Sequence, residues 1–203
     1  MKYTELNDAQ KAKARDWYRE VQRNDNWYER VYEDAIQVAR LLGITIGEKQ
    51  WRATNGRTGT SPAIYFSGFW SQGDGACFEG EWQGYVGMVE ALKEYAPQDE
   101  RLHEIAKHLQ IESAKYDHNV VATCTHSGHY YHSGCMEIEF NYEDVELDDA
   151  AAVNIRHYLR AFADWIYRQL EEESEEIDKD ANIEEVLMDG DYDFDVGTGG
   201  IRI

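Results

Sequence analysis

The chain has few cysteines, few basic residues and no long apolar run, and each shortage excludes a class of protein. Only three of its 203 residues are cysteine. So small and odd a number favours a reducing cytosol over a disulfide framework. No apolar run approaches the ~18–20 residues that cross a bilayer. The N-terminus carries no apolar segment flanked by basic residues, so no signal peptide is read. We therefore expect a cytoplasmic protein that does not contact membranes.

Basic side chains are outnumbered two to one, with 20 Lys and Arg against 40 Asp and Glu, which gives a net charge of −20. Such a charge repels phosphates at long range, so we expect neither direct nucleic-acid binding nor an anionic membrane surface. A basic protein partner fits this charge. With 42% hydrophobic and 13% aromatic residues, the chain also has enough apolar surface to fold, unlike a disordered acidic tail.

The acidic residues are concentrated in the last third of the chain. Between Glu137 and Asp195 there are 21 acidic and four basic side chains, a net charge of −17. Self-repulsion at this density costs stability, which suggests that the charge has a use. The alternative is a solvated, frayed C-terminal region, which is what charge runs usually are. If the charge binds a partner, the expected contacts are a glutamate run and aspartates at every second position: Glu171, Glu172, Glu173, Glu175, Glu176, Asp189, Asp191, Asp193 and Asp195.

Helical periodicity recurs along the chain. Asn26 and Glu29 resemble a capping box that starts a helix, and Gly43 is placed to end that helix. Asp148 and Asp149 are expected to cap the longest helix. The ranges expected to be helical are 7–23, 27–42, 86–95, 99–114, 150–173 and 181–188.

Strand patterns lie between these helices. The expected strands are 44–46, 63–70, 76–82, 120–126 and 130–142, and residues 47–62 are expected to form a polar loop. Two hairpins interleaved with helices predict an α+β fold, in which an antiparallel sheet packs against several helices and a long acidic helix lies near the C-terminus. We find no repeat or linker, so we expect one domain over residues 1–203, with an acidic helical C-terminal region at 150–203.

The densest group of potential metal ligands lies within twelve residues and comprises Cys124, His126, His129, His132 and Cys135. Thiolates and imidazoles are ligands that zinc prefers. However, His132 and Cys135 would point to opposite faces of a strand, and no Cys-x-x-Cys pair is present. A hairpin with stacked imidazoles is therefore favoured. His126, His129, His132 and Cys135 stay weak candidates, and we expect no cofactor.

Cys77 is a candidate nucleophile. Its run Asp74-Gly75-Ala76-Cys77 resembles the one around the catalytic cysteine of ovarian-tumour-type cysteine proteases. The following residues alternate like a strand and bring two glutamates, which would raise the pKa of a thiol. A core-facing cysteine is favoured. No carboxylate pair among Glu79, Glu81, Glu137 and Glu139 is brought together by sequence alone. The packed face of the sheet is expected to consist of the neighbouring aromatics, Tyr65, Phe66, Phe69, Trp70, Phe78 and Trp82.

Three motifs carry a resemblance to a known group of proteins. They are FSGFWSQGDG at Phe66–Gly75, HSGHYYHSGC at His126–Cys135, and WIYRQLE at Trp165–Glu171. With them the chain resembles a poorly characterised family from phages, prophages and their bacterial hosts, some of whose members are labelled antitoxins of toxin–antitoxin systems. The resemblance implies no catalytic residue. It implies a place in the host cytoplasm if the gene belongs to a phage.

Charge and resemblance together lead to one main hypothesis. The protein would neutralise a basic, nucleic-acid-binding partner by direct binding, either as an antitoxin or as a DNA-mimicking inhibitor of a defence system such as restriction or CRISPR. A hydrolase that uses Cys77 or a zinc ion is the alternative. High like charge disfavours broad self-association, so we expect a monomer or a dimer.

Overall fold

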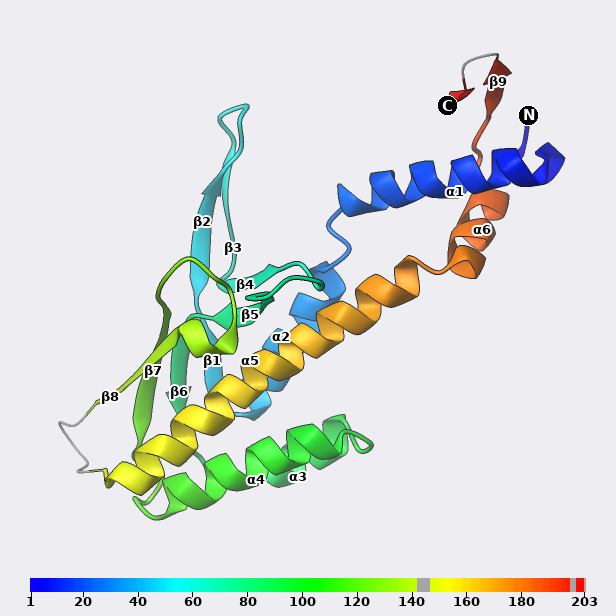
Figure 1. The fold of residues 1–203 in the computed structure, drawn as a ribbon. Helices are drawn as coiled ribbons and strands as arrows, with labels where there is room; N and C mark the ends of the chain where they lie inside the picture. The colour runs from blue at the N-terminus through cyan, green and yellow to red at the C-terminus, as the bar shows by residue number, and fades with distance from the viewer. Residues whose placement is uncertain (142–146, 198–199, 203) are drawn as a thin grey trace. The chain divides into compact units, whose positions relative to one another are not determined.

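A computed structural model describes the backbone of residues 1–141, 147–197 and 200–202, and the side chains of residues 1–141 and 147–195 (Figure 1). Contacts between residues divide the chain into two compact units. The larger unit is Val31–Gln169, and the smaller unit combines Met1–Arg30 with Leu170–Ile203.

A four-stranded antiparallel sheet forms the centre of the larger unit, with the strand order β1-β6-β7-β8. Side chains alternate between its two faces, as they must in extended chain. On β8, Met136 and Ile138 are buried, whereas Glu137 and Glu139 are exposed. The sheet therefore has one apolar face and one polar face. The strands are Ile44–Ile46 (β1), Gly80–Gln83 (β6), Val121–His126 (β7) and Met136–Phe140 (β8).

Two further hairpins extend from this sheet, formed by β2 (Glu48–Arg52) with β3 (Thr58–Pro62) and by β4 (Ile64–Ser67) with β5 (Gly75–Phe78). The prediction of a polar loop over residues 47–62 is wrong, because β2 and β3 pair there over five residues. The expected strand 76–82 is two strands in different sheets. They meet at Glu79, whose backbone pairs with Ala63 on one side and Gly47 on the other.

The strand predicted at 130–142 is also too long. It begins only at Met136, after a 3₁₀ turn (η2, Ser133–Cys135), and residues 130–132 are loop. The last predicted position, 142, lies outside the described residues. Four glycine and serine residues around the histidines favour turns over pairing, which explains the shorter strand.

The helices agree with the predictions in number and order, but two of them start two residues later than predicted, at Glu29 and at Met88. The helix predicted directly after Asn26 begins instead at Glu29, whose N–H donates to the Asn26 carbonyl at 3.0 Å. Gly43 ends this helix with φ +78°, as predicted. In the larger unit the helices are Glu29–Leu41 (α2, from its third residue), Met88–Tyr95 (α3), Glu100–Ala114 (α4) and Asp149–Ile177 (α5, as far as Gln169).

Helix α5 packs on the apolar face of the sheet. Asp148 caps it, since its carboxylate accepts the Ala151 N–H at 2.7 Å. Arg156 donates to the carbonyl of Ile138 at 3.0 Å, and Arg160 donates to that of Met136 at 2.8 Å. These two arginines cover backbone acceptors on the edge strand β8, which would otherwise be open to pairing with another strand.

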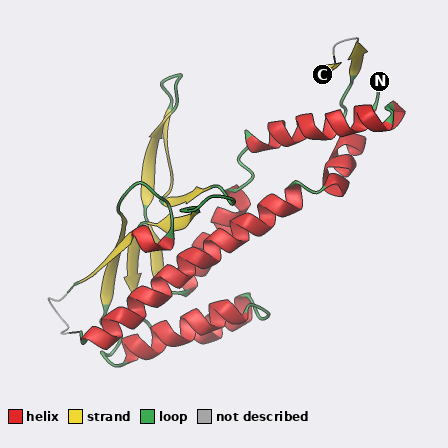
Figure 2. Cartoon of the chain, in the orientation of Figure 1, coloured by secondary structure: helices red, strands yellow, loops and turns green. Residues whose placement is uncertain are grey.

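The smaller unit has its own small core. Helix α1 (Asp8–Arg23) lies against α6 (Asp180–Asp189), and both contribute to the unit's buried cluster of Tyr3, Leu6, Ala14, Ile183, Leu187 and Phe194. A 3₁₀ turn (η1, Tyr3–Glu5), the last turns of α5 and the short strands β9 (Asp195–Gly197) and β10 (Gly200–Arg202) complete this unit (Figure 2).

The α+β fold is confirmed, with antiparallel hairpins, several helices and a long helix near the C-terminus. Among the helices that the structure describes, none is both long and apolar enough to cross a membrane.

Candidate functional site

The turn between β4 and β5 holds the most exposed large apolar side chain among the described residues, Trp70, which is 89% exposed. One carboxylate oxygen of Asp74 accepts the backbone N–H of Trp70 at 2.9 Å and that of Ser71 at 2.6 Å. Gly73 closes the turn with φ +98°, a conformation that favours glycine. The turn therefore has a fixed conformation that presents an indole to solvent.

The second sequence motif packs directly on this turn. A Cβ at Gly73 would lie 2.9 Å from the ring of Tyr130, and one at Gly75 would lie 2.5 Å from the Cβ of His132. The second motif thus leaves no room for a side chain at these two positions of the first motif, which explains why both are glycine. Tyr130 itself is 55% exposed, so it adds a second aromatic side chain to the same surface.

The third motif reaches the same place from α5. The hydroxyl of Tyr167 donates to the carbonyl of Gly68 at 3.0 Å, and its ring lies 5.5 Å from that of Phe69. Trp165, in the same motif, donates to the carboxylate of Asp99 at 2.8 Å. Three segments that are far apart in the sequence thus meet at the β4–β5 turn. We use the name motif surface for the following exposed side chains of the turn and of the second motif: Trp70, Ser71, Gln72, His129 and Tyr130.

A polar network lies beneath the motif surface. The Tyr65 hydroxyl donates to one carboxylate oxygen of Glu79 at 3.1 Å, and the other oxygen accepts the backbone N–H of His126 at 3.2 Å. The Tyr65 ring stacks on those of His126 and Tyr131, at 5.6 and 5.5 Å. Burial and the hydrogen bond to Glu79 raise the pKa of Tyr65 to about 12. The network joins β4, β7 and the loop that follows β7.

The amine of Lys49 completes this network. Its Nζ lies 4.0 Å from the centre of the Tyr65 ring and donates to the Ile64 carbonyl at 2.5 Å. Burial lowers the pKa of this lysine, and the nearby Cys77 and Glu79 act in the opposite direction. Its cation therefore stabilises the base of the β2–β3 hairpin against the Tyr65 ring.

The cysteines lie mainly in the core. Cys77 and Cys124 are buried, and burial raises the pKa of both thiols to about 12; for Cys77, the neighbouring Cys135 and Glu79 add to the shift. A buried, protonated thiol is a poor nucleophile, so the geometry gives no support to Cys77 as a catalytic residue. Cys135 is partly exposed, with its Sγ 3.4 Å from the Nε2 of His132.

The histidines of the second motif have separate surroundings. The Nε2 of His126 lies 3.1 Å from the carbonyl of Tyr130, and the ring of His129 lies 5.3 Å from that of Tyr130. Within the described part of the chain, no three His, Cys, Asp or Glu side chains are placed to hold a metal ion. The aromatic stacking favoured from the sequence is present at His126, on Tyr65.

The glutamates of the sheet lie on its polar face, except Glu79. Glu81 lies opposite Thr123, and Thr123 lies opposite Glu139, so these three residues form a row across three strands. Glu137 is opposite Thr125. All three of these glutamates are exposed, and none makes an ion pair with a described residue. They form an open acidic surface.

The acidic residues expected to contact a partner fall into two groups, and both belong to the smaller unit. Five of them lie on the last turns of α5, where Glu172, Glu175 and Glu176 are exposed and Glu171 and Glu173 are half-buried. Glu176 pairs with Lys179, which lowers the pKa of its carboxyl. The other four α5 glutamates make no ion pair with a described residue.

The second group of acids begins at Asp189, the last residue of α6, and is exposed throughout. Lys2 pairs with Asp191 at 2.7 Å and with Asp193 at 3.2 Å, so one amine contacts two of the four carboxylates. The ion pair with Lys2 lowers the pKa of Asp191. Asp189 and Asp195 pair with no described residue. The chain's own base thus neutralises part of this group.

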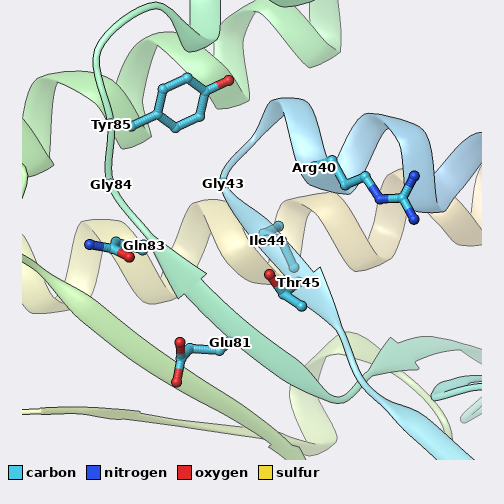
Figure 3. A pocket seen from close by; sticks show the side chains of 8 residues that line it. All are labelled: Arg40, Gly43, Ile44, Thr45, Glu81, Gln83, Gly84 and Tyr85. Carbon is cyan, nitrogen blue, oxygen red and sulfur yellow. The ribbon is translucent and has the colours of Figure 1, made fainter.

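An open recess of about 430 Å³ lies at the edge of the four-stranded sheet (Figure 3). The end of α2, β1, β6 and the chain after β6 surround it. Figure 3 shows its lining side chains, most of which are polar. The residues that line the recess are Arg40, Gly43, Ile44, Thr45, Glu81, Gln83, Gly84 and Tyr85. The recess continues into the acidic surface at Glu81.

Sequence reasoning missed the two most useful features of this region. It placed Trp70 on the packed face of the sheet, whereas the structure exposes it, because β4 ends at Ser67. The sequence signal was present, since the turn residues Ser71–Gly75 begin directly after Trp70. It also missed Trp51, which is 46% exposed on the β2–β3 hairpin.

Comparison with known proteins gives a family and no function. No curated protein and no solved structure matches the chain. A family model described as a domain of unknown function, DUF8835, matches residues 27–180. This match covers most of the chain, all three motifs and the whole motif surface, and the protein therefore belongs to the DUF8835 family.

Proposed function

We propose that the protein acts by binding and neutralising another protein, and that the motif surface is its contact. The observation that carries this proposal is the 89% exposure of Trp70 on a turn whose backbone is fixed by Asp74. Exposed tryptophan is costly in water, and buried tryptophan supplies much of the binding energy at protein interfaces. A rigid turn loses little conformational entropy when it binds.

The net charge of −20 supports a basic partner, such as a nucleic-acid-binding toxin or defence protein. Attraction between opposite charges speeds the encounter of two proteins, and a buried aromatic contact then slows their dissociation. An antitoxin and a DNA-mimicking inhibitor of a defence system would both work in this way. The hydrolase alternative is not proposed, since Cys77 is buried and its thiol pKa is raised.

A capture experiment with matched variants tests the proposal. The tagged wild-type protein, Trp70→Ser and Val86→Ser are each incubated with lysate of cells in which the protein naturally occurs, and bound proteins are quantified by mass spectrometry. Val86 is the control because it is 74% exposed and lies outside the motif surface. A partner retained by the wild type and by Val86→Ser, but lost with Trp70→Ser, supports the proposal. Equal retention by all three contradicts it.

Affinity for the purified partner then gives the size of the effect. Truncation of a central interface tryptophan costs about 2 kcal/mol or more, so Trp70→Ser should raise the Kd by about 30-fold or more in isothermal titration. Val86→Ser should change the Kd by less than about threefold.

The glutamates on the last turns of α5 are proposed as a second contact, because Glu171, Glu172 and Glu175 remain without an ion pair to a described residue. A contact of this kind is screened by salt. Reversal of Glu172 and Glu175 to lysine should therefore reduce the salt dependence of the Kd. An unchanged salt dependence would remove these residues from the contact.

A further inference from the structure

The β2–β3 hairpin has few contacts with the rest of the larger unit. It projects away from the four-stranded sheet (Figure 1), and most of its residues from Gln50 to Thr60 are exposed. An isolated two-stranded hairpin is at best marginally stable in water, and it gains stability when another surface packs on it. Lys49 anchors the base of the hairpin to Tyr65 and Ile64, and the arm from Gln50 to Thr60 extends beyond that contact.

One face of this arm carries an aromatic platform. Trp51 lies opposite Gly59, and a Cβ at Gly59 would be 2.5 Å from the indole ring. The indole Nε1 donates to the Thr60 carbonyl at 3.4 Å. The ring therefore lies across the hairpin where the partner strand has no side chain, with nearly half of its surface exposed.

The arm is also basic, in a strongly acidic chain. Arg52 lies at the end of β2, and Arg57 lies just before β3, so both flank the turn at the tip. Both are exposed, and neither makes an ion pair with a described residue. Two unpaired cations beside an exposed indole fit a surface that offers carboxylates.

The same unit contains such a surface. The recess at the sheet edge continues at Glu81 into the row of exposed side chains that ends at Glu139, with Glu137 beside it. Neither these carboxylates nor the two arginines make an ion pair with a described residue, although Arg40 also lines the recess that holds Glu81. In Figure 1 the tip of the arm points away from the strands that carry these glutamates, so the arm does not meet them within one chain.

We propose that the β2–β3 arm of one chain docks on the recess and acidic sheet face of a second copy. Trp51 would lie at the recess, and Arg52 and Arg57 would face Glu81, Glu137 and Glu139. The occupant is a second copy because the arginines of the arm and the glutamates of the sheet face carry opposite charges and belong to the same chain. The contact is distinct from the motif surface, so this inference stands apart from the proposed function.

Molar mass in solution tests this inference. Light scattering of the full-length protein during gel filtration, at about 50 mM salt, should give at least twice the chain mass of 23.6 kDa. At about 500 mM salt the mass should fall toward that of one chain, because screening weakens the charge contacts. One chain mass at every salt and protein concentration would overturn the proposal.

Charge reversal shows whether these two surfaces meet. The variant Arg52→Glu/Arg57→Glu and the variant Glu137→Arg/Glu139→Arg should each lose self-association, while circular dichroism confirms that both are folded. A mixture of the two should associate again, since each supplies the charge that the other has lost. Self-association that survives in either variant, or no association in the mixture, would overturn the proposal.

A last control addresses nucleic acid, which could also use an indole beside two arginines. Fluorescence anisotropy with a labelled single-stranded oligonucleotide should show no binding at about 50 mM salt. Binding that depends on Trp51 and Arg57 would show that the arm has a different occupant and would contradict the proposal.

Discussion

At the scale of single residues, the structure depends on a few carboxylates that fix a turn or join separate segments. Asp74 fixes the Trp70 turn, and Glu79 accepts hydrogen bonds from β4 and β7 at once. Periodicity reveals neither role: Asp74 accepts from residues three and four positions before it in the same turn, and Glu79 joins segments that only the fold brings together. Asp74 and Glu79 are therefore acidic residues that stabilise the structure around the motif surface.

Replacement of Asp74 should loosen the Trp70 turn. In Asp74→Ala the N–H groups of Trp70 and Ser71 lose their shared acceptor, and each such charged hydrogen bond is worth roughly 1.5–3 kcal/mol. Amide hydrogen exchange at these two residues should become at least about tenfold faster. Asp74→Asn keeps a side-chain oxygen and should retain most of the protection. Equal exchange in the wild type and Asp74→Ala would contradict this account of the turn.

Tyr65 should make stability fall at alkaline pH. Its pKa is raised from 10.0 to about 12, so the folded state keeps the phenol proton where the unfolded state loses it. The stabilising contribution is complete below pH 10 and is lost as the pH rises toward 12. Urea unfolding between these pH values should show a smaller loss for Tyr65→Phe than for the wild type. Parallel curves for the two proteins would contradict this role.

At the scale of elements, sequence periodicity predicted the helices better than the strands. Helix α5 has a continuous apolar stripe and an aspartate cap, so both signals agree. Residues 76–82 were predicted as one strand, whereas the structure has two, β5 and β6. The alternation of side chains continues through Glu79, although the backbone passes from one sheet to the other there. The β2–β3 hairpin was missed because it is exposed on both faces, and alternation marks only strands with one buried face.

The three motifs were found from the sequence, but their meeting point was not. Their contact depends on Gly73 and Gly75, which leave room for Tyr130 and His132. From the sequence, a glycine in a turn is first explained by a backbone conformation that other residues rarely adopt. That another segment packs against the glycine is seen only in the folded structure. This is why the motif surface could not be derived from spacing alone.

A methyl group at Gly75 should separate two of these elements. In Gly75→Ala the new Cβ would lie 2.5 Å from the Cβ and 2.8 Å from the Cα of His132, so the backbone must move. Overpacking of this kind costs about 1–3 kcal/mol in the free energy of unfolding. Chemical denaturation measures it, with the exposed Ser127→Ala as control. A cost below about 0.5 kcal/mol would show that the two motifs are not packed so closely.

At the scale of the whole molecule, the excess of negative charge is distributed over both units, and its uses differ. In the smaller unit Lys2 and Lys179 pair with some of the acids expected to bind a partner. In the larger unit the acidic sheet face lies apart from the motif surface, where Trp70 and Tyr130 are exposed. We therefore propose that the charge attracts a basic partner and that the aromatic turn makes the specific contact.

Site-specific photocrosslinking in living cells in which the protein naturally occurs tests that assignment most directly. A benzophenone amino acid replaces Trp70 in one strain and Val86 in another, and covalent adducts are identified after irradiation. We expect that position 70 gives one dominant crosslinked protein and that position 86 gives no crosslink to that protein. No adduct at position 70, or the same adducts from both positions, would contradict the claim that the Trp70 turn is the partner contact.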